Sequence, residues 1–467
     1  MRGPARPEFA LSDRASCATV PRMDRAHLAI LGGGPAGLAV GYYARKLGLP
    51  FTIYEATDRV GGNCVTLHHG DFAFDSCAHR FHDQEPQETA ELQTLLGAEL
   101  QRIDVPSLIY SEGRFVDFPL SPLNLLRTVG PLTCLRAAGE VIRARMSHGP
   151  APTDFEAFAL RTYGRTLAER FLLGYSTKLW GVPCRELSPR VAGKRMKGLT
   201  LKTFLKEALF GSKAKTEHLD GAFYYPRTGI GAIPGAMAAA CGAENIRLRA
   251  EITGIRCDSD RIAAVQVNGR EWADASFVVS TLPLNRFLRM MTPPAPEPLL
   301  AVADRLQYRN VILVAVLLNR PSVTHAATLY FPGPEFPFTR LYEPRNRSAA
   351  MAPENRTSLV IEMPCQANDP VWTAPDELLV ERVCGPLLRS GLIRQEEVLD
   401  TTVFRMPMAY PVLRAGFEHL LEQITNYLGS FRNLALSGRS GRFAYSHVHD
   451  LMKWGRQIAH DIAARLG

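Results

Sequence analysis

Residues 27–55 read HLAILGGGPAGLAVGYYARKLGLPFTIYE, and the fold class follows from their pattern. His27–Leu31 is a short apolar run typical of a buried parallel strand, and Phe51–Tyr54 is a second such run. A glycine turn and a segment of helical character lie between them. An acidic residue, Glu55, closes the stretch. Strand, glycine turn, helix, strand and acidic residue in this order predict a βαβ unit.

The glycine spacing is that of a dinucleotide-binding turn. Gly32 permits the tight turn, Gly34 lets backbone approach a pyrophosphate, and Gly37 lets the helix pack closely on the strand. The helix N-terminus presents unpaired N–H groups to phosphate. Glu55 is placed to accept hydrogen bonds from ribose hydroxyls, which disfavours the 2′-phosphate of NADP. The predicted nucleotide contacts are Gly32, Gly34, Pro35, Ala36, Gly37 and Glu55.

A second pair of glycines, Gly61 and Gly62, follows Arg59 shortly after the βαβ unit. Adjacent glycines would let another backbone segment run close to the pyrophosphate. This pair resembles the two-dinucleotide-binding-domain flavoproteins, in which it accompanies FAD. The return to strand, glycine turn and helix over Leu434–Gly467 suits the same group. The resemblance implies FAD as the cofactor, with Arg59, Gly61, Gly62, Asn63 and Ile252 among its contacts.

Three later motifs resemble UDP-galactopyranose mutases, and the first is also related to amine oxidases and protoporphyrinogen oxidases. Phe74–His82 is similar to the mutase G-P-H-x-F-H segment, and Gly174–Gly181 to the G-Y-T-x-K-Q-W-G run. Gly438–Tyr445 is similar to the G-R-x-G-x-Y-x-Y motif beside the flavin. The chain also resembles flavoproteins of bacterial polysaccharide and secondary-metabolite loci.

The resemblance implies roles for single residues. The expected catalytic residues are His79, Arg439 and Tyr445. Arg439 is included because a cation near flavin N1 would stabilise the reduced ring. His79, Gly438 and Arg439 also join the expected cofactor contacts. An aromatic face would stack on a planar ring and a guanidinium would hold a diphosphate. The residues expected to bind substrate in this way are Tyr175, Trp180, Arg195 and Tyr410.

Structural roles stay open for some of these side chains. Trp180 could be a core residue, and His79 and His82 could be hydrogen-bonded structural histidines. The local His and Asp residues match no metal-ligand spacing, so no metal is expected. Cys64 and Cys77 near the cofactor raise a covalent flavin link as an alternative.

These features together predict an α/β chain: a Rossmann-like FAD-binding domain of the two-dinucleotide-binding-domain type with an inserted mixed α+β substrate domain. The FAD-binding domain is expected in three segments, over residues 27–105, 221–283 and 409–467. The substrate domain is expected to be mostly helical over 106–220 and to contain strands and helices over 284–408. Residues 1–26 are expected to be a flexible extension, with Met23 as an alternative start.

Composition narrows the class of protein. The 467 residues exceed what one hydrophobic core organises, and 46% apolar with 21% charged residues is an ordinary globular composition. The sequence contains no uninterrupted run of about 18 or more apolar residues, so a membrane-spanning helix is not expected. Nine scattered cysteines indicate reduced thiols. The first 26 residues do not resemble a secretory signal, so a cytoplasmic location is expected.

The formal net charge of +8 is unevenly distributed. Seven of the nine lysines lie between Lys178 and Lys215. This basic run is either a solvated helix face or an anion funnel that grips a diphosphate or carboxylate. A nucleic-acid partner is not expected, because no recognised motif accompanies the charge.

Three functions remain open from the sequence. The first is an FAD-dependent oxidoreductase that transfers hydride from a small-molecule substrate to flavin N5. It is favoured because the mutase D-M-D stretch is replaced here by Ser446–Asp450, with His447 and His449. The alternative is a nucleotide-sugar isomerase like UDP-galactopyranose mutase, using reduced FAD as nucleophile. The third is a flavin-bound scaffold or membrane-peripheral protein using the amphipathic segment Leu120–Met146. The oligomeric state stays open.

Overall fold

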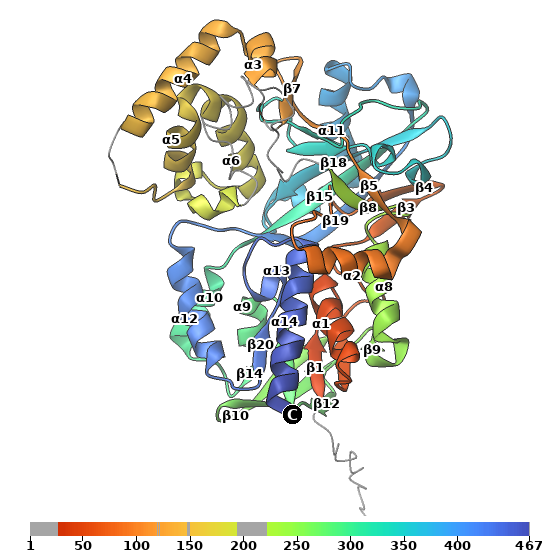
Figure 1. The fold of residues 1–467 in the computed structure, drawn as a ribbon, viewed down its shortest axis with the longest axis vertical. Helices are drawn as coiled ribbons and strands as arrows, with labels where there is room; N and C mark the ends of the chain where they lie inside the picture. The colour runs from red at the N-terminus through yellow and green to blue at the C-terminus, as the bar shows by residue number, and fades with distance from the viewer. Residues whose placement is uncertain (1–26, 119, 121, 147–149, 194–221, 467) are drawn as a thin grey trace, which may run out of the picture.

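A computed structural model describes residues 27–118, 120, 122–146, 150–193 and 222–466 (Figure 1). The chain is an α/β protein, as the sequence predicts, with a five-stranded sheet and a seven-stranded sheet as its largest sheets. The expected extension over residues 1–26 and the predicted substrate ligand Arg195 lie outside the described residues.

The five-stranded sheet is parallel, in the order β20-β13-β1-β2-β9. Its apolar strands are buried on both faces, as is typical of parallel strands between covering layers. In β1, Leu28 and Ile30 face one buried cluster, and Ala29 and Leu31 face another. The strands span Leu28–Leu31 (β1), Phe51–Tyr54 (β2), Ile246–Arg247 (β9), Phe277–Ser280 (β13) and Leu434–Leu436 (β20).

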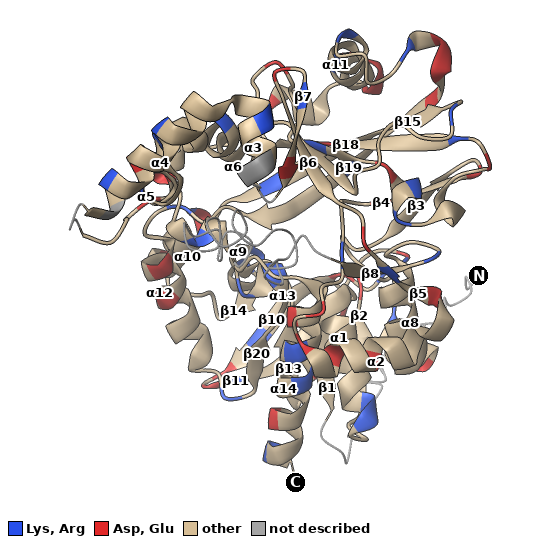
Figure 2. Ribbon diagram, turned by 45° about the horizontal axis from the view of Figure 1, so that its top comes forward, with Lys and Arg blue, Asp and Glu red and all other residues tan. Residues whose placement is uncertain are grey.

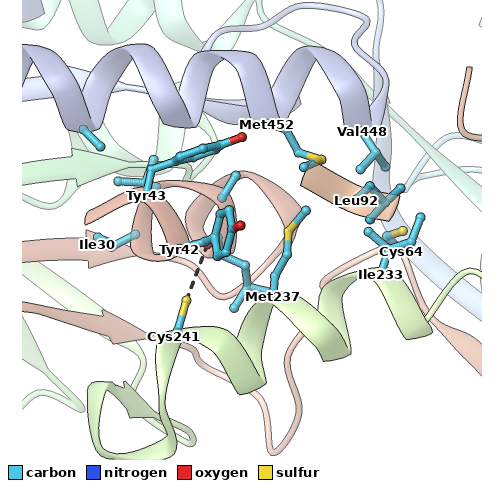
Figure 3. Close-up of a cluster of buried hydrophobic side chains, with 14 of the residues drawn as sticks. Ile30, Tyr42, Tyr43, Cys64, Leu92, Ile233, Met237, Cys241, Val448 and Met452 are labelled. Atoms are coloured by element: carbon cyan, nitrogen blue, oxygen red, sulfur yellow. Dashed lines mark hydrogen bonds between the residues drawn. The ribbon is translucent and has the colours of Figure 1, made fainter. Parts of the chain in front are cut away.

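Helices cover one face of this sheet, and Figure 3 shows part of the core beneath them. Met237 and Met452 pack with Tyr42 and Tyr43 in that core. A Cβ on Gly455 would lie 2.8 Å from Ala39, so the C-terminal helix packs closely on the first one. These helices are Pro35–Lys46 (α1), Pro86–Leu96 (α2), Ala232–Cys241 (α8) and Val448–Leu466 (α14).

The opposite face packs on a four-stranded sheet, in the order β12-β11-β10-β14, and on three helices. The strands are Ile252–Asp258 (β10), Arg261–Val267 (β11), Glu271–Asp274 (β12) and Met291–Thr292 (β14). The helices are Leu284–Arg289 (α9), Glu297–Asp304 (α10) and Phe417–Gly429 (α12).

The seven-stranded sheet has the order β19-β15-β18-β17-β16-β6-β7. Its strands are Ser107–Ser111 (β6), Arg114–Phe118 (β7), Tyr308–Leu318 (β15), Thr328–Tyr330 (β16), Arg340–Tyr342 (β17), Thr357–Cys365 (β18) and Val398–Pro411 (β19). The segment expected to be mostly helical from residue 106 therefore begins with two strands. All five residues of β6 are buried, and β6 pairs in parallel with β16. Helix α11 (Asp376–Arg389) packs on one face of this sheet.

A helical group lies on the other face (Figure 1). Residues 154–173 have an amphipathic pattern but do not form one regular helix, because Gly164, with φ of 74°, interrupts it. Asp154 caps the first part, since its carboxylate accepts a hydrogen bond from Ala157 N at 2.8 Å. The helices are Pro122–Val129 (α3), Pro131–Met146 (α4), Phe155–Leu167 (α5) and Gly174–Trp180 (α6), with a π-helical turn over Ala168–Leu173.

Candidate functional site

A cavity of about 310 Å³ lies between the parallel sheet and the seven-stranded sheet. One part of its wall is the glycine turn after β1, which is the usual place for ligands of parallel sheets. The remaining wall includes Arg340 on β17, Tyr410 on β19 and the turn of α13 (Gly438–Gly441). The cavity therefore joins the predicted nucleotide site to residues from the second sheet.

The two glycine-bearing segments of the sequence meet in this cavity. A Cβ on Gly62 would lie 3.3 Å from the Cα of Gly34, so the two backbone segments are in close contact and a side chain at Gly62 would crowd them. Gly61 N donates to the carbonyl of Gly33 at 2.9 Å, which holds the segments together. Of the predicted nucleotide contacts, the residues that line the cavity are Gly32, Gly34, Pro35, Ala36, Glu55, Gly62 and Asn63. Gly37 has a packing role, since a Cβ there would overlap the Gly32 carbonyl.

Arg59 and Ile252 lie outside the cavity wall. Arg59 is exposed, and its guanidinium donates to the Gly62 carbonyl at 3.1 Å. Ile252 is buried in β10 among residues such as Leu31 and Tyr54, and it does not line the cavity. Arg59 therefore supports the second glycine segment, and the Ile252 side chain is used in the core.

Glu55 is buried beside the glycine turn, where the sequence places it. One carboxylate oxygen accepts from Gly33 N at 2.8 Å, and the other accepts from Thr57 N at 2.9 Å. These bonds fix the carboxylate on the cavity wall. Its role as the ribose acceptor stays a prediction.

His79 lines the cavity with a fixed orientation. Its Nε2 lies 3.0 Å from the Asn63 carbonyl, and a carbonyl only accepts, so Nε2 carries the proton. Burial, reinforced by the charge of Arg439, lowers the pKa of His79 to about 3. The ring is therefore neutral at physiological pH.

Arg439 is a fixed cation on the same wall. Its guanidinium donates to the Ala409 carbonyl at 3.0 Å and to the Ser446 carbonyl at 2.9 Å. The guanidinium carbon also lies 5.3 Å from the ring centre of Tyr410 and 5.1 Å from that of Tyr445. The preceding Gly438, with φ of 82°, starts this turn.

The aromatic residues expected to bind substrate or to act on it occupy different positions relative to the cavity. Tyr410 and Tyr445 line the cavity with nearly parallel rings, 6.0 Å apart at an angle of 29°. Trp180 is 5% exposed and contacts both rings edge-on from behind, at 6.3 and 6.2 Å. Tyr175 packs edge-on against Tyr330 and does not line the cavity.

Sequence reasoning missed a buried ion pair at the cavity. Arg340 donates to the Glu362 carboxylate at 2.6 Å and to the Tyr410 hydroxyl at 2.9 Å. The other Glu362 oxygen accepts from Ala78 N at 2.7 Å. Arg340 itself lines the cavity. The sequence signal for this ion pair was the presence of opposite charges in two segments that form buried strands, since charges are rarely buried without a partner.

Three histidines gather beside this wall. His82 and His447 line the cavity with ring centres 5.6 Å apart, and His449 stacks on His447 at 5.5 Å. His449 Nε2 also lies 3.6 Å from the Asp450 carboxylate. Within the described ranges, no three His, Cys, Asp or Glu side chains are arranged to hold a metal ion.

The two cysteines near the cofactor site are poor nucleophiles. Cys64 and Cys77 both line the cavity and are buried. Burial raises the pKa of both thiols, that of Cys77 to about 12. Because the thiolate is the reactive form, this setting disfavours a covalent flavin link.

Lys178 is the first lysine of the basic run. It lies neither on a solvated helix face nor in an anion funnel, which were the two arrangements expected for that run. Its ammonium donates to the carbonyls of Phe331, Gly333, Phe336 and Phe338, at 2.6 to 3.2 Å. Burial lowers its pKa to about 8. Lys178 therefore fastens α6 to the loop between β16 and β17. The lysines from Lys194 to Lys215 lie outside the described residues.

The cavity residues fit a bound dinucleotide. Gly34 and Gly62 line the cavity without side chains, so a phosphate could approach their backbone there, and Glu55 lines the same cavity. Ser446 also lines the cavity, and its buried hydroxyl has no hydrogen-bond partner among the described residues. Buried hydroxyls normally have such a partner, so a ligand atom would complete this one.

These features define a flavoprotein with an FAD site of the two-dinucleotide-binding-domain type. The profile of the flavin containing amine oxidoreductase family matches residues 35–405. The chain belongs to this family, and FAD is its cofactor.

Solved structures with the same fold include enzymes with different reactions. A reduced UDP-galactopyranose mutase is 22% identical with a TM-score of 0.82, and 94% of each chain is covered. A candidate protoporphyrinogen oxidase from Exiguobacterium sp. is 18% identical with a TM-score of 0.75, covering 95% of this chain and 100% of the other. A cyclohexylamine oxidase from Brevibacterium oxydans is 15% identical with a TM-score of 0.66, covering 95% and 99%. Within the described part of the chain, no helix is long and apolar enough to span a membrane.

Proposed function

We propose that this chain is an FAD-dependent oxidoreductase that takes a hydride from a small anionic substrate. The observation that carries the proposal is the wall formed by Arg340, Arg439, Tyr410 and Tyr445. The charge of Arg340 is balanced by Glu362, whereas Arg439 donates to two neutral carbonyls, so the wall carries a net positive charge that favours a carboxylate or phosphate over an ammonium group. The proposed substrate therefore differs in charge from the amines named for some relatives.

Bound FAD would supply the hydride acceptor at N5 and pass electrons to a second acceptor such as oxygen. Arg439 is the proposed cation beside the flavin, because its bonds to two carbonyls hold it in one orientation. Cys77 and Tyr410 keep their protons, since burial raises the pKa of both groups. The rings of Tyr410 and Tyr445 would exclude water and orient the substrate.

The substrate proton needs an acceptor other than His79. A group with a pKa of about 3 is a weak base at neutral pH, so His79 serves as a neutral hydrogen-bond partner. We assign the proton transfer to Tyr445, which would pass the proton to His447. The ring centres of Tyr445 and His447 lie 5.5 Å apart, and both residues line the cavity.

An anaerobic titration tests the proposal. The oxidised holoenzyme would be mixed with hydroxy acids, amino acids, sugar phosphates and nucleotide sugars, and the visible absorbance of the flavin would be followed. We expect bleaching by an anionic compound and none by its uncharged or cationic analogue. Tyr410→Phe should slow the bleaching, whereas Tyr427→Phe, outside the cavity, should not. Bleaching by amines alone would contradict the proposal.

A second candidate is the redox-neutral isomerisation of a nucleotide sugar. It is favoured by the cluster of Trp180, Tyr410 and Tyr445 beside Arg340, which suits a planar base and a diphosphate. The test is to reduce the enzyme with dithionite, add UDP-galactofuranose, and separate the products by chromatography. Product formed only with reduced enzyme would favour this candidate, and bleaching of oxidised enzyme would favour the first.

A further inference from the structure

Helix α4 carries apolar side chains on two opposite faces. Ala137 and Val141 are buried on its inner face. On the outer face, Leu132, Leu135 and Met146 are 81%, 69% and 72% exposed. These are the three most exposed large apolar side chains among the described residues. An exposed group of this kind marks an interaction surface more often than isolated side chains do.

The exposed residues form a continuous stripe. Leu132, Leu135, Gly139, Ile142 and Met146 follow one another at intervals of three and four residues, so they lie along one side of the helix. The exposed Leu126 of the preceding helix α3 adds a further leucine. In Figure 1, α4 lies at the edge of the molecule, away from the parallel sheet. We call this surface the α4 stripe.

Positive charge accompanies the α4 stripe. Arg136 and Arg143 are exposed one position after Leu135 and Ile142, and Arg127 is exposed on α3. Figure 2 shows basic positions along α4 in blue. The acid on α4, Glu140, is held against α5, where it accepts hydrogen bonds from Thr166 N and Oγ1 and pairs with Arg136. The exposed surface is therefore apolar and basic.

We propose that the α4 stripe docks this protein on an anionic phospholipid surface, with α4 lying in the plane of the interface. Leucine, isoleucine and methionine would enter the boundary between headgroups and acyl chains. The neighbouring arginines would contact the lipid phosphates. Self-association is less suited to this surface, because a symmetric contact would bring the same arginines together. The proposal is independent of the reaction at the cavity.

Vesicle flotation of the full-length holoenzyme tests this surface. We expect binding to phosphatidylglycerol-containing vesicles and weaker binding to pure phosphatidylcholine. A double variant, L132S/L135S, should lower the partition coefficient at least about tenfold. R136Q/R143Q should lower binding to anionic vesicles about fivefold per arginine. Bound flavin should be unchanged in both variants and the melting temperature nearly so, because all four side chains are exposed and Arg136 gives up only a surface ion pair with Glu140.

Matched variants at other exposed leucines provide the control. L378S/L399S changes two exposed leucines outside α4 and should float like the wild type. Absence of vesicle binding by the wild type would overturn the proposal, as would undiminished binding of L132S/L135S. Light scattering after gel filtration measures whether the protein is a monomer or a dimer. A dimer that L132S/L135S dissociates, without any flotation, would assign the α4 stripe to a second copy of the chain and overturn the lipid proposal.

Discussion

At the turn after β1, Gly34 presents the backbone that the cofactor phosphates would approach. Its φ of −73° suits any residue, so a substitution would not strain the backbone. A Cβ at this position would lie 3.9 Å from the Cα of Gly62, so a leucine would cover the backbone that lines the cavity. We therefore expect Gly34→Leu to purify without FAD and with unchanged circular dichroism. Gly429→Leu is the control, because Gly429 is exposed and a Cβ there meets no atom within 4 Å. Full flavin content in Gly34→Leu would contradict the pyrophosphate assignment.

His79 makes stability depend on pH. Its pKa is about 3 in the folded chain and 6.5 as the reference value, so between these values the unfolded state binds more protons. The stability that this group contributes is fully present above about pH 6.5 and is lost as the pH falls toward about 3. The contribution to the slope is up to about 1 kcal/mol per pH unit.

Urea unfolding at about pH 7, 6 and 5 measures this slope. We expect a shallower acid loss in His79→Asn than in the wild type. His419→Asn changes an exposed histidine and should keep the wild-type slope. Equal slopes for wild type and His79→Asn would show that the imidazole is not held neutral by its surroundings.

Among the elements, α6 is fastened to the loop between β16 and β17 by a buried ammonium group. The Lys178 ammonium satisfies four carbonyls of the loop between β16 and β17. Lys178→Met would leave these carbonyls without a donor, so we expect the free energy of unfolding to fall by about 1–3 kcal/mol. Lys46→Met removes a surface ion pair with Glu91 and should cost at most about 1 kcal/mol. Chemical unfolding of the two variants makes the comparison, and equal losses would argue against the attachment.

Across the whole molecule, buried hydrogen bonds join the nucleotide site to the second sheet. The Tyr342 hydroxyl donates to the Asp75 carbonyl at 2.6 Å, and Arg347 donates to the His79 carbonyl at 2.9 Å. We expect unfolding and flavin release to occur in one transition. Tyr342→Phe should lower the free energy of unfolding by about 1–3 kcal/mol and shift both signals together.

Circular dichroism and flavin fluorescence, recorded during the same thermal melt, check this expectation. Tyr427→Phe is the control. Tyr427 is partly exposed on α12 and takes no part in the hydrogen bonds of Tyr342 and Arg347 that join the nucleotide site to the second sheet. Flavin release well below the loss of secondary structure would show that the two parts unfold separately.

The nucleotide half of the site could be predicted because its determinants are local. The backbone approach at Gly34 and the closing acid Glu55 depend on residues within one βαβ unit, and the spacing of these residues is visible in the sequence. The strands β1 and β13 could be predicted because they are continuous apolar runs. Arg439 and Tyr445 were found through resemblance to a known motif.

The remaining features depend on contacts between distant segments. Arg340 and Glu362 are 22 residues apart, and only the pairing of β17 with β18 brings them together. Lys178 was part of a basic run in the sequence, and its carbonyl partners lie more than 150 residues away. The strands β6 and β7 were missed: they pair with each other, and only β6 joins them to the sheet, through β16, which lies far along the chain.

The pairing of β20 with β13 places an edge of the parallel sheet near the end of the chain. During synthesis, this edge stays open until Leu436 has left the ribosome, and α14 reaches α1 later still. The unfinished sheet would expose unpaired backbone and apolar surface during that time, which is a condition for aggregation or chaperone binding. A premature stop before Gly438 would also remove Arg439 and Tyr445 from the cavity wall. Chains that stop before Gly438 should therefore be cleared by proteolysis, and FAD should be captured only after residues 438–445 have been synthesised.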